Sequence, residues 1–167
     1  LYAGIRRAVS HLVETGHIRL GFMSGDPGNV WFRSRHQAFM DGLFEHGLPF
    51  HPEWMKLTSG DDKEEDFRAL DSIWAQRERP TAIVCGNDAR ALHLLDFCRT
   101  RGLRVPDDLA ATGFDNIPES AVSSPSLTTV DGNDLEQGRK TAVLLWRRAR
   151  LPRRCENRSR TDCQAVH

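Results

Sequence analysis

A proline opens the clearest predicted strand of this chain, which reads Pro80-Thr81-Ala82-Ile83-Val84-Cys85. A short polar loop, Gly86-Asn87-Asp88, follows it directly. Residues 88–101 then carry apolar side chains at helical spacing as far as Gly102. A short apolar run behind a proline indicates a buried strand, and a glycine after a periodic segment indicates the end of a helix. This region therefore predicts a strand, a polar loop and a helix in immediate succession.

The same alternation extends outward to both sides of this unit. We predict further helices over residues 2–15, 31–46, 64–76 and about 134–148, and strands over residues 18–23, 54–57, 109–114 and 127–130. Strands that alternate with helices through short connections form a parallel sheet covered on both faces. The predicted fold class is therefore α/β. Ligands of such sheets bind at the carboxyl ends of the strands, so the loops at 24–31, 86–88 and 115–118 are the first places to inspect.

Composition and charge exclude several classes of protein. The 167 residues, 39% hydrophobic and 28% charged, suit one globular domain. Because 23 basic residues balance 23 acidic ones, no overall field draws the chain to nucleic acid or to an anionic membrane. No apolar run is long enough to cross a bilayer, and the first residues lack the order of a signal peptide. The absent initial methionine suggests a chain cut from a longer one.

The cysteines and the C-terminal tail leave alternatives open. None of the four cysteines forms a C-x-x-C pair, and we expect reduced thiols in a cytoplasmic protein. A disulfide or metal site from Cys155 and Cys163 is the alternative. The tail from Arg147 onward is rich in arginine. It is interpreted as a solvated end, with a nucleic-acid arm as the second possibility.

Polar side chains with complementary chemistry follow the predicted strands. Asn87 and Asp115 each come directly after a strand, and Arg35 lies in the helix that follows the first one. A guanidinium supplies donors, a carboxylate acceptors and an amide both, which suits a ligand rich in hydroxyls or ring nitrogens. Each residue also has a simpler interpretation. Asn87 or Asp88 can cap a helix, Asp115 and Asn116 can form a turn, Arg35 can be exposed, and Trp31 can be core.

Catalytic patterns are missing from the sequence. It contains no G-x-S-x-G elbow, no G-x-G-x-x-G and no P-loop. Asp88 and Asp115 could form a carboxylate pair or bind Mg²⁺, but no nucleophile or base accompanies them. We therefore expect no enzyme activity, no cofactor and no metal.

Six segments, in order over residues 15–130, resemble motifs of LacI/GalR-type transcriptional regulators. The family motifs are "LGHRRIGFISG", R-x-x-G-F, "RPTAIFAGND", "GLRVPEDV", "GFDDIP" and "LTTV", and the matching segments are Thr15–Gly25, Arg35–Phe39, Arg79–Asp88, Gly102–Asp108, Gly113–Pro118 and Leu127–Val130. The resemblance implies a periplasmic-binding-protein-like type I fold, truncated at its N-terminus. Residues 1–129 would form the C-terminal lobe of the effector-binding domain, residues 130–150 a crossover and a helix of the other lobe, and residues 151–167 a divergent basic tail.

The resemblance also implies a function and a site. Members of the family bind a sugar, nucleobase or similar effector between two lobes and thereby modulate DNA binding by a helix-turn-helix, which is missing here. A solute-binding protein of a sugar transporter is the alternative. Carried over by position, Arg35, Asn87 and Asp115 match effector-contacting residues, while Asn29 and Trp31 lie in a loop that reaches the effector. Asp61 is included because it stands where members usually carry an aromatic residue that stacks on the effector.

The expected partners follow from the same resemblance. They are a small-molecule effector and a second copy of the chain, which would make contact through residues 64–76 and 89–101. DNA would be bound only through the missing N-terminal domain, and no membrane is expected. Neither the identity of the effector nor its effect on DNA binding follows from the sequence.

Overall fold

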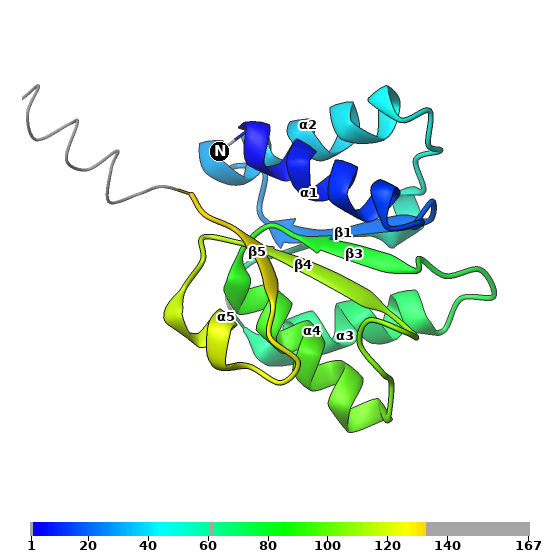
Figure 1. Cartoon of the computed structure of the whole chain (residues 1–167), viewed down its shortest axis with the longest axis vertical. Coiled ribbons are helices and arrows are strands. Elements are labelled where there is room, and N and C mark those ends of the chain that lie inside the picture. The colour runs from blue at the N-terminus through cyan, green and yellow to red at the C-terminus, as the bar shows by residue number, and fades with distance from the viewer. Residues whose placement is uncertain (1, 61, 133–167) are drawn as a thin grey trace, which may run out of the picture. The chain divides into compact units, whose positions relative to one another are not determined.

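The computed structural model describes residues 2–60 and 62–132, which contain a parallel sheet of five strands in the order β2-β1-β3-β4-β5 (Figure 1). Phe22 of β1 pairs with Met55 of β2 on one side and with Val84 of β3 on the other. The strands are β1 (Leu20–Gly25), β2 (Met55–Thr58), β3 (Ala82–Cys85), β4 (Ala110–Phe114) and β5 (Thr128–Val130).

Helices cover both faces of the sheet. Figure 1 shows α1 and α2 on one face and α3 and α4 on the other. The helices are α1 (Tyr2–Glu14), α2 (Val30–Glu45), α3 (Lys63–Trp74), α4 (Asp88–Arg101) and α5 (Pro118–Val122), with the 3₁₀ turn η1 (Pro52–Trp54) before β2. Among the described residues, no helix combines the length and the apolar character needed to cross a membrane.

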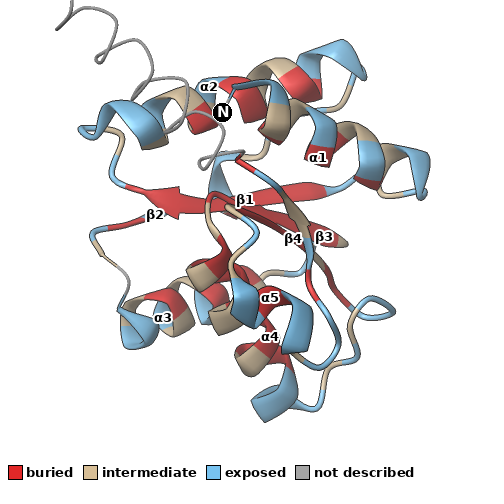
Figure 2. Ribbon diagram, turned by 60° about the vertical axis from the view of Figure 1, so that its left-hand side comes forward, coloured by how far each residue is buried: buried red, intermediate tan, exposed pale blue. Residues whose placement is uncertain are grey.

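The sheet separates two hydrophobic cores because successive side chains of a strand point to opposite faces. In β3, Val84 joins the core beneath α1 and α2, whereas Ile83 joins the core beneath α3 and α4. Figure 2 shows the central strands buried and each helix buried on the side that meets the sheet. Central parallel strands are therefore apolar on both faces, and their polar side chains are confined to the strand ends.

Local sequence signals set the ends of several helices. Gly16 and Gly102 have φ of 97° and 68°, the left-handed conformation that ends a helix at little cost for glycine. The side chains of Asn29, Asp62 and Asn87 accept hydrogen bonds from the first backbone N–H groups of α2, α3 and α4. α2 and α4 therefore begin within a few residues of the carboxyl ends of β1 and β3.

The predicted α/β class and parallel sheet are confirmed, with several local corrections. Trp54 ends η1 rather than beginning β2, and β3 begins at Ala82 rather than at Pro80. β1 begins at Leu20 rather than Ile18 and continues through Gly25, because pairing with β3 starts at Leu20 opposite Ala82. The proline- and serine-rich stretch after β4 contains the short helix α5, which its sequence pattern does not predict. The predicted helix at 134–148, the arginine-rich tail, Cys155 and Cys163 lie outside the described residues. The assignment of residues 1–129, 130–150 and 151–167 to separate parts stays a prediction.

Candidate functional site

Two of the predicted site residues, 80 positions apart in the chain, form an ion pair at the carboxyl ends of the strands. Nη2 of Arg35, in α2, donates to Oδ1 of Asp115, directly after β4, at 2.8 Å. The arginine side chain is 9% exposed and the aspartate side chain 30%. The carboxylate is thus the partner that solvent can reach. The predicted meeting of guanidinium and carboxylate is therefore observed, and Arg35 is buried rather than surface-exposed.

Arg35 is held in this position by two further contacts. The guanidinium donates from Nη1 to the Gly86 carbonyl and lies over the Phe114 ring, with Cζ 4.4 Å from the ring centroid. A Cβ added to Gly86 would lie 2.1 Å from Oγ of Ser24, so no larger residue fits there without movement. Ser24 Oγ and Arg35 Nε are buried and lack a hydrogen-bond partner in the part of the chain that the structure describes.

Asp115 itself has an unusual backbone. Its φ is 109° and that of Asn116 is 53°, both in the region that side chains other than glycine rarely adopt. The Asp115 N–H donates to the Val130 carbonyl at 2.9 Å, which ties this turn to β5. A non-glycine residue held in such a conformation stores roughly 1–3 kcal/mol of strain, and such residues cluster at functional sites.

The two asparagines of the predicted site act as helix caps. Oδ1 of Asn87 accepts from the Arg90 N–H at 3.1 Å, and Oδ1 of Asn29 accepts from the Trp31 N–H at 2.9 Å. The capping interpretation of Asn87 is confirmed, and Asn29 caps α2, which the sequence analysis did not predict. Contact of either residue with an effector stays a prediction. Trp31 is 58% exposed, so its core interpretation is wrong. Asp61 lies outside the described residues.

Asp88 has a structural role at this end of the sheet. It is 1% exposed. Its Oδ2 accepts from the Ile117 N–H at 2.9 Å and from Ser120 Oγ at 2.7 Å, and its Oδ1 accepts from Thr129 Oγ1 at 2.6 Å. These bonds fasten α5 and β5 to the start of α4. The carboxylate pair with Asp115 that the sequence left open is not favoured, because the Asp88 oxygens already accept three hydrogen bonds.

Sequence reasoning missed a second buried arginine near the same strand ends. Arg90, in the first turn of α4, is 1% exposed and donates from Nε to Thr58 Oγ1 at 3.0 Å and from Nη2 to the Gly60 carbonyl. Asp66 is fully buried nearby, with Oδ1 3.8 Å from Arg90 Nε. Oδ2 of Asp66 is bound to Nδ1 of His93 at 2.7 Å. In the sequence, Arg90 is only a charged residue on the sheet-facing side of a predicted helix. The sequence alone does not show whether such a residue is buried or exposed.

The described residues offer neither a metal-binding cluster of His, Cys, Asp and Glu nor a reactive thiol. No group of three or more such residues comes together within residues 2–60 and 62–132. Cys85 and Cys98 are free and buried. Burial raises the pKa of both thiols, that of Cys98 to about 11, so both are protonated at neutral pH.

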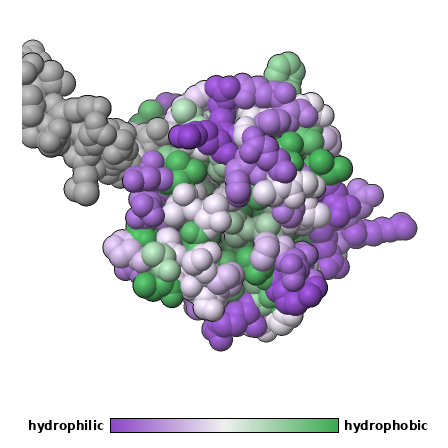
Figure 3. Space-filling model, in the orientation of Figure 1, coloured by the Kyte–Doolittle hydropathy of each residue, from purple (hydrophilic) through white to green (hydrophobic). Residues whose placement is uncertain are grey.

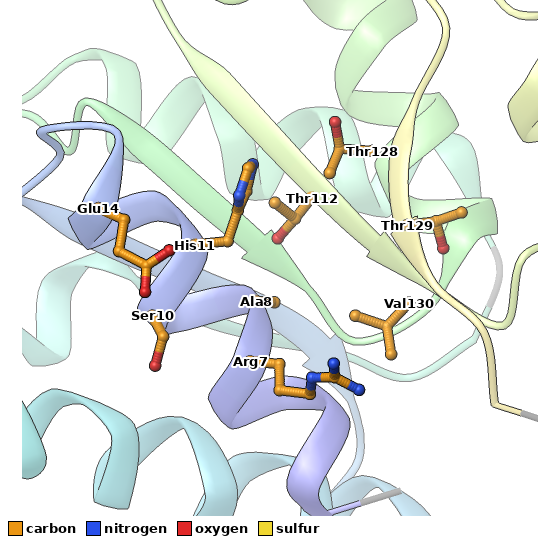
Figure 4. A pocket seen from close by; sticks show the side chains of 9 residues that line it. All are labelled: Arg7, Ala8, Ser10, His11, Glu14, Thr112, Thr128, Thr129 and Val130. Carbon is orange, nitrogen blue, oxygen red and sulfur yellow. The ribbon is translucent and has the colours of Figure 1, made fainter.

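Two hollows are lined by other residues than the predicted site. The larger, about 430 Å³, runs between α1 and the β4–β5 edge (Figure 4), and the smaller measures about 330 Å³. In Figure 4 His11 projects from α1 towards Thr112 of β4. Figure 3 shows polar side chains around the outside of this face and more apolar ones towards its middle. Neither hollow is lined by Arg35, Asn87 or Asp115, and the larger has charged groups of its own, Arg7 and Glu14.

Comparison with known proteins identifies relatives of this chain. A family model described as a periplasmic binding protein-like domain matches residues 9–166. The transcriptional repressor PurR of Haemophilus influenzae is 33% identical over 141 residues, which cover 84% of this chain and 42% of the repressor. The chain therefore spans less than half the length of that relative.

Solved structures agree with the sequence relatives. A regulatory protein of the LacI family from Chloroflexus aggregans superposes with a TM-score of 0.81 at 28% identity, covering 91% of this chain and 55% of that one. The transcriptional regulator CelR in complex with cellobiose superposes with a TM-score of 0.80 at 26% identity, covering 88% and 45%. The chain belongs to the periplasmic binding protein-like domain family, in the branch found in LacI-family transcriptional regulators.

Proposed function

We propose that this domain senses a small polar effector at the carboxyl ends of its strands and thereby modulates DNA binding by a separate part of the regulator. The Arg35–Asp115 pair carries the proposal. It places a buried donor beside a carboxylate that is 30% exposed, on a backbone held at positive φ. Asn87 begins α4 at the same edge of the sheet. A few placed polar groups of this kind orient a small ligand and give specificity.

The charge of the site favours an uncharged or weakly charged effector. The guanidinium of Arg35 and the carboxylate of Asp115 compensate each other. A fully charged ligand would have to compete with one partner of this pair, whereas hydroxyls or ring nitrogens can bond to both. A sugar or a nucleobase fits this chemistry. PurR, by its name a repressor, and CelR, solved with cellobiose, are relatives whose names support a regulatory binding role over catalysis.

Regulation of DNA binding also requires a second state. We propose that the effector stabilises one arrangement of a two-lobed domain over another, as any ligand with different affinities for two states does. A homodimer that makes contact through α3 and α4 would pass this change to a paired DNA-binding part. Such a regulator acts in the cytoplasm, where DNA is found, and needs neither a cofactor nor a membrane.

Isothermal titration calorimetry on the full-length protein tests the site. A thermal-shift screen of sugars and nucleobases first identifies a ligand that stabilises the wild type. We expect Arg35→Ala and Asp115→Ala each to weaken its binding by at least about tenfold, because each removes a charged hydrogen-bonding partner worth roughly 1.5–3 kcal/mol.

A matched control separates this effect from general damage. Arg104 forms an exposed ion pair with Asp108, with Nη2 and Oδ1 2.9 Å apart, away from the site. Arg104→Ala should leave effector affinity unchanged. If Arg35→Ala and Asp115→Ala both fold and bind the ligand as tightly as this control, the site assignment is wrong.

A further inference from the structure

The larger hollow, between α1 and the β4–β5 edge, has a floor of threonine side chains. Thr112 of β4 faces α1, as do Ala110 and Phe114 two positions before and after it, which belong to the core beneath that helix. Thr112 is 2% exposed, and its Oγ1 has no hydrogen-bond partner within the part of the chain that the structure describes. Thr128 of β5 pairs with Thr112 in register, lines the same hollow and is exposed (Figure 4). The floor therefore contains two hydroxyl groups, and the buried one is unpartnered, which is uncommon and costs free energy.

Opposite charges lie at the two ends of the α1 face that lines this hollow. Arg7 and Glu14 are seven positions apart in α1, and both line the hollow (Figure 4). Residues at this spacing share one face of a helix and are about 10 Å apart along its axis. Neither forms an ion pair with a described residue, whereas the neighbouring Arg6 pairs with Glu45 of α2. A positive and a negative group are therefore both open to a ligand in the hollow.

The size and lining of the hollow suit a small molecule. Its volume is about 430 Å³, and sites for small ligands are usually hollows of roughly 300–1,000 Å³ with a few placed polar groups. Ala8 and Val130 add apolar surface to its walls. A complementary ligand carries a negative group at one end, a positive group at the other and a hydrogen-bonding group between them. Because neither Arg35 nor Asp115 lines the hollow, such a ligand would not compete for the effector site.

We propose that this hollow is a second binding site, for a short peptide with free amino and carboxyl ends. The peptide carboxylate pairs with Arg7 and its ammonium with Glu14. An amide between them bonds to the hydroxyls of Thr112 and Thr128, since an amide both donates and accepts. An extended tripeptide is about 10 Å long, which matches the separation of Arg7 and Glu14 along α1. A ligand with a single charge would leave one end of the hollow unpaired.

The test uses the full-length protein and two probes of matched length, each titrated by isothermal calorimetry. Triglycine has ammonium and carboxylate ends with two amides between them, whereas 8-aminooctanoate joins the same ends by methylene groups alone. Arg7→Gln and Glu14→Gln each remove one charge at an exposed position. Thr112→Val removes the buried hydroxyl and keeps the shape of the side chain. Arg6→Gln is the matched control, because that arginine pairs with α2 instead of lining the hollow.

We expect triglycine to bind the wild type. Arg7→Gln and Glu14→Gln should each weaken the binding of both probes about three- to fivefold, because an ion pair near solvent contributes modestly. Thr112→Val should weaken triglycine about fivefold and leave 8-aminooctanoate unchanged, since only the peptide bonds to the hydroxyl. Arg6→Gln should change neither affinity. Without ligand, Thr112→Val should melt at or above the wild-type temperature, because it removes a buried hydroxyl that has no partner.

Several results would overturn this second site. If triglycine does not bind the wild type, or if Arg6→Gln weakens it as much as Arg7→Gln does, the hollow is not a peptide site. If Thr112→Val weakens both probes equally or neither, the amide contact is wrong. A lower melting temperature of Thr112→Val would show that its hydroxyl is already bonded within the protein. None of these results bears on the pair of Arg35 and Asp115, so the effector site stands or falls separately.

Discussion

Two buried arginines flank the ring of Phe32, Arg35 with its Cζ 5.8 Å and Arg90 with its Cζ 5.4 Å from the ring centroid. Their carboxylate partners differ in how far solvent reaches them. Arg35 pairs with Asp115, whose side chain is 30% exposed. Arg90 lies beside Asp66, whose side chain is fully buried. Arg35 thus pairs with a carboxylate that solvent can reach. Arg90 instead fastens the β2–α3 loop, through Thr58 and Gly60, to the start of α4.

The comparison teaches that residue type and burial do not by themselves indicate function. Both arginines are nearly inaccessible, and both make hydrogen bonds to backbone carbonyls. What differs is the environment of the partner carboxylate. A carboxylate surrounded by protein donors can only stabilise the fold, whereas one that solvent reaches can exchange water for ligand. The expected effects of substitution therefore differ between the two sides.

The largest loss of stability is expected at Arg90. Arg90→Met keeps much of the volume but leaves Asp66 without the guanidinium beside it and the Gly60 carbonyl without a donor. Removing one partner of a buried ion pair costs about 3–5 kcal/mol. Urea denaturation followed by circular dichroism measures the change. A loss of stability below about 1 kcal/mol would mean that Arg90 and its partners do not stabilise the fold as argued above.

The next largest loss of stability is expected at Asp88, whose hydrogen bonds join the start of α4 to α5 and β5. Asp88→Ala leaves the Ile117 N–H and two hydroxyl groups without their acceptor, and each buried unpaired donor costs roughly 1–3 kcal/mol. We expect the free energy of unfolding to fall by about 2–3 kcal/mol in total, since the hydroxyls can rotate. Asp88→Asn, which keeps an acceptor oxygen, should lose less. Equal losses in the two variants would contradict this account.

Substitutions of Asp115 should change the free energy of unfolding by less, and they separate the backbone strain at this residue from its ion pair with Arg35. Both Asp115→Ala and Asp115→Gly remove the ion pair with Arg35, but only glycine adopts a φ of 109° without strain. The glycine variant should therefore be about 1 kcal/mol more stable than the alanine variant. Both should lose effector affinity equally. Equal stability of the two variants would show that the backbone at this position is not strained.

The smallest effect is expected for the exposed pair of Arg104 and Asp108. Arg104 lowers the pKa of the Asp108 carboxyl through hydrogen bonds and charge. A lowered pKa in the folded state gives stability that is present above the pKa of the unfolded state and is lost as the pH falls through the folded pKa. Because both side chains face solvent, Arg104→Ala should leave the urea midpoint unchanged at pH 7. A clear shift would mean that surface pairs also support this fold.

Much of the fold was predictable because its signals are local. The apolar run ending at Cys85, the glycine after α4 and the asparagine caps each act within a few residues of the chain. α5 was missed because it is five residues long and is held by a distant contact, the bond from Ser120 to Asp88. The start of β1 was misplaced because pairing with β3, rather than hydrophobicity, sets it.

The sequence by itself determined the α/β class, the parallel order of its elements and the meeting of Arg35 with Asp115, because the carboxyl ends of parallel strands share one edge. Only the tertiary structure decided that Asp88 holds α5 and β5 to the start of α4, that Arg90 is buried, and that the Phe32 ring lies near two guanidinium groups. Those roles depend on contacts between α2, α4 and the β2–α3 loop, and a residue's distant neighbours are set by packing rather than by local spacing.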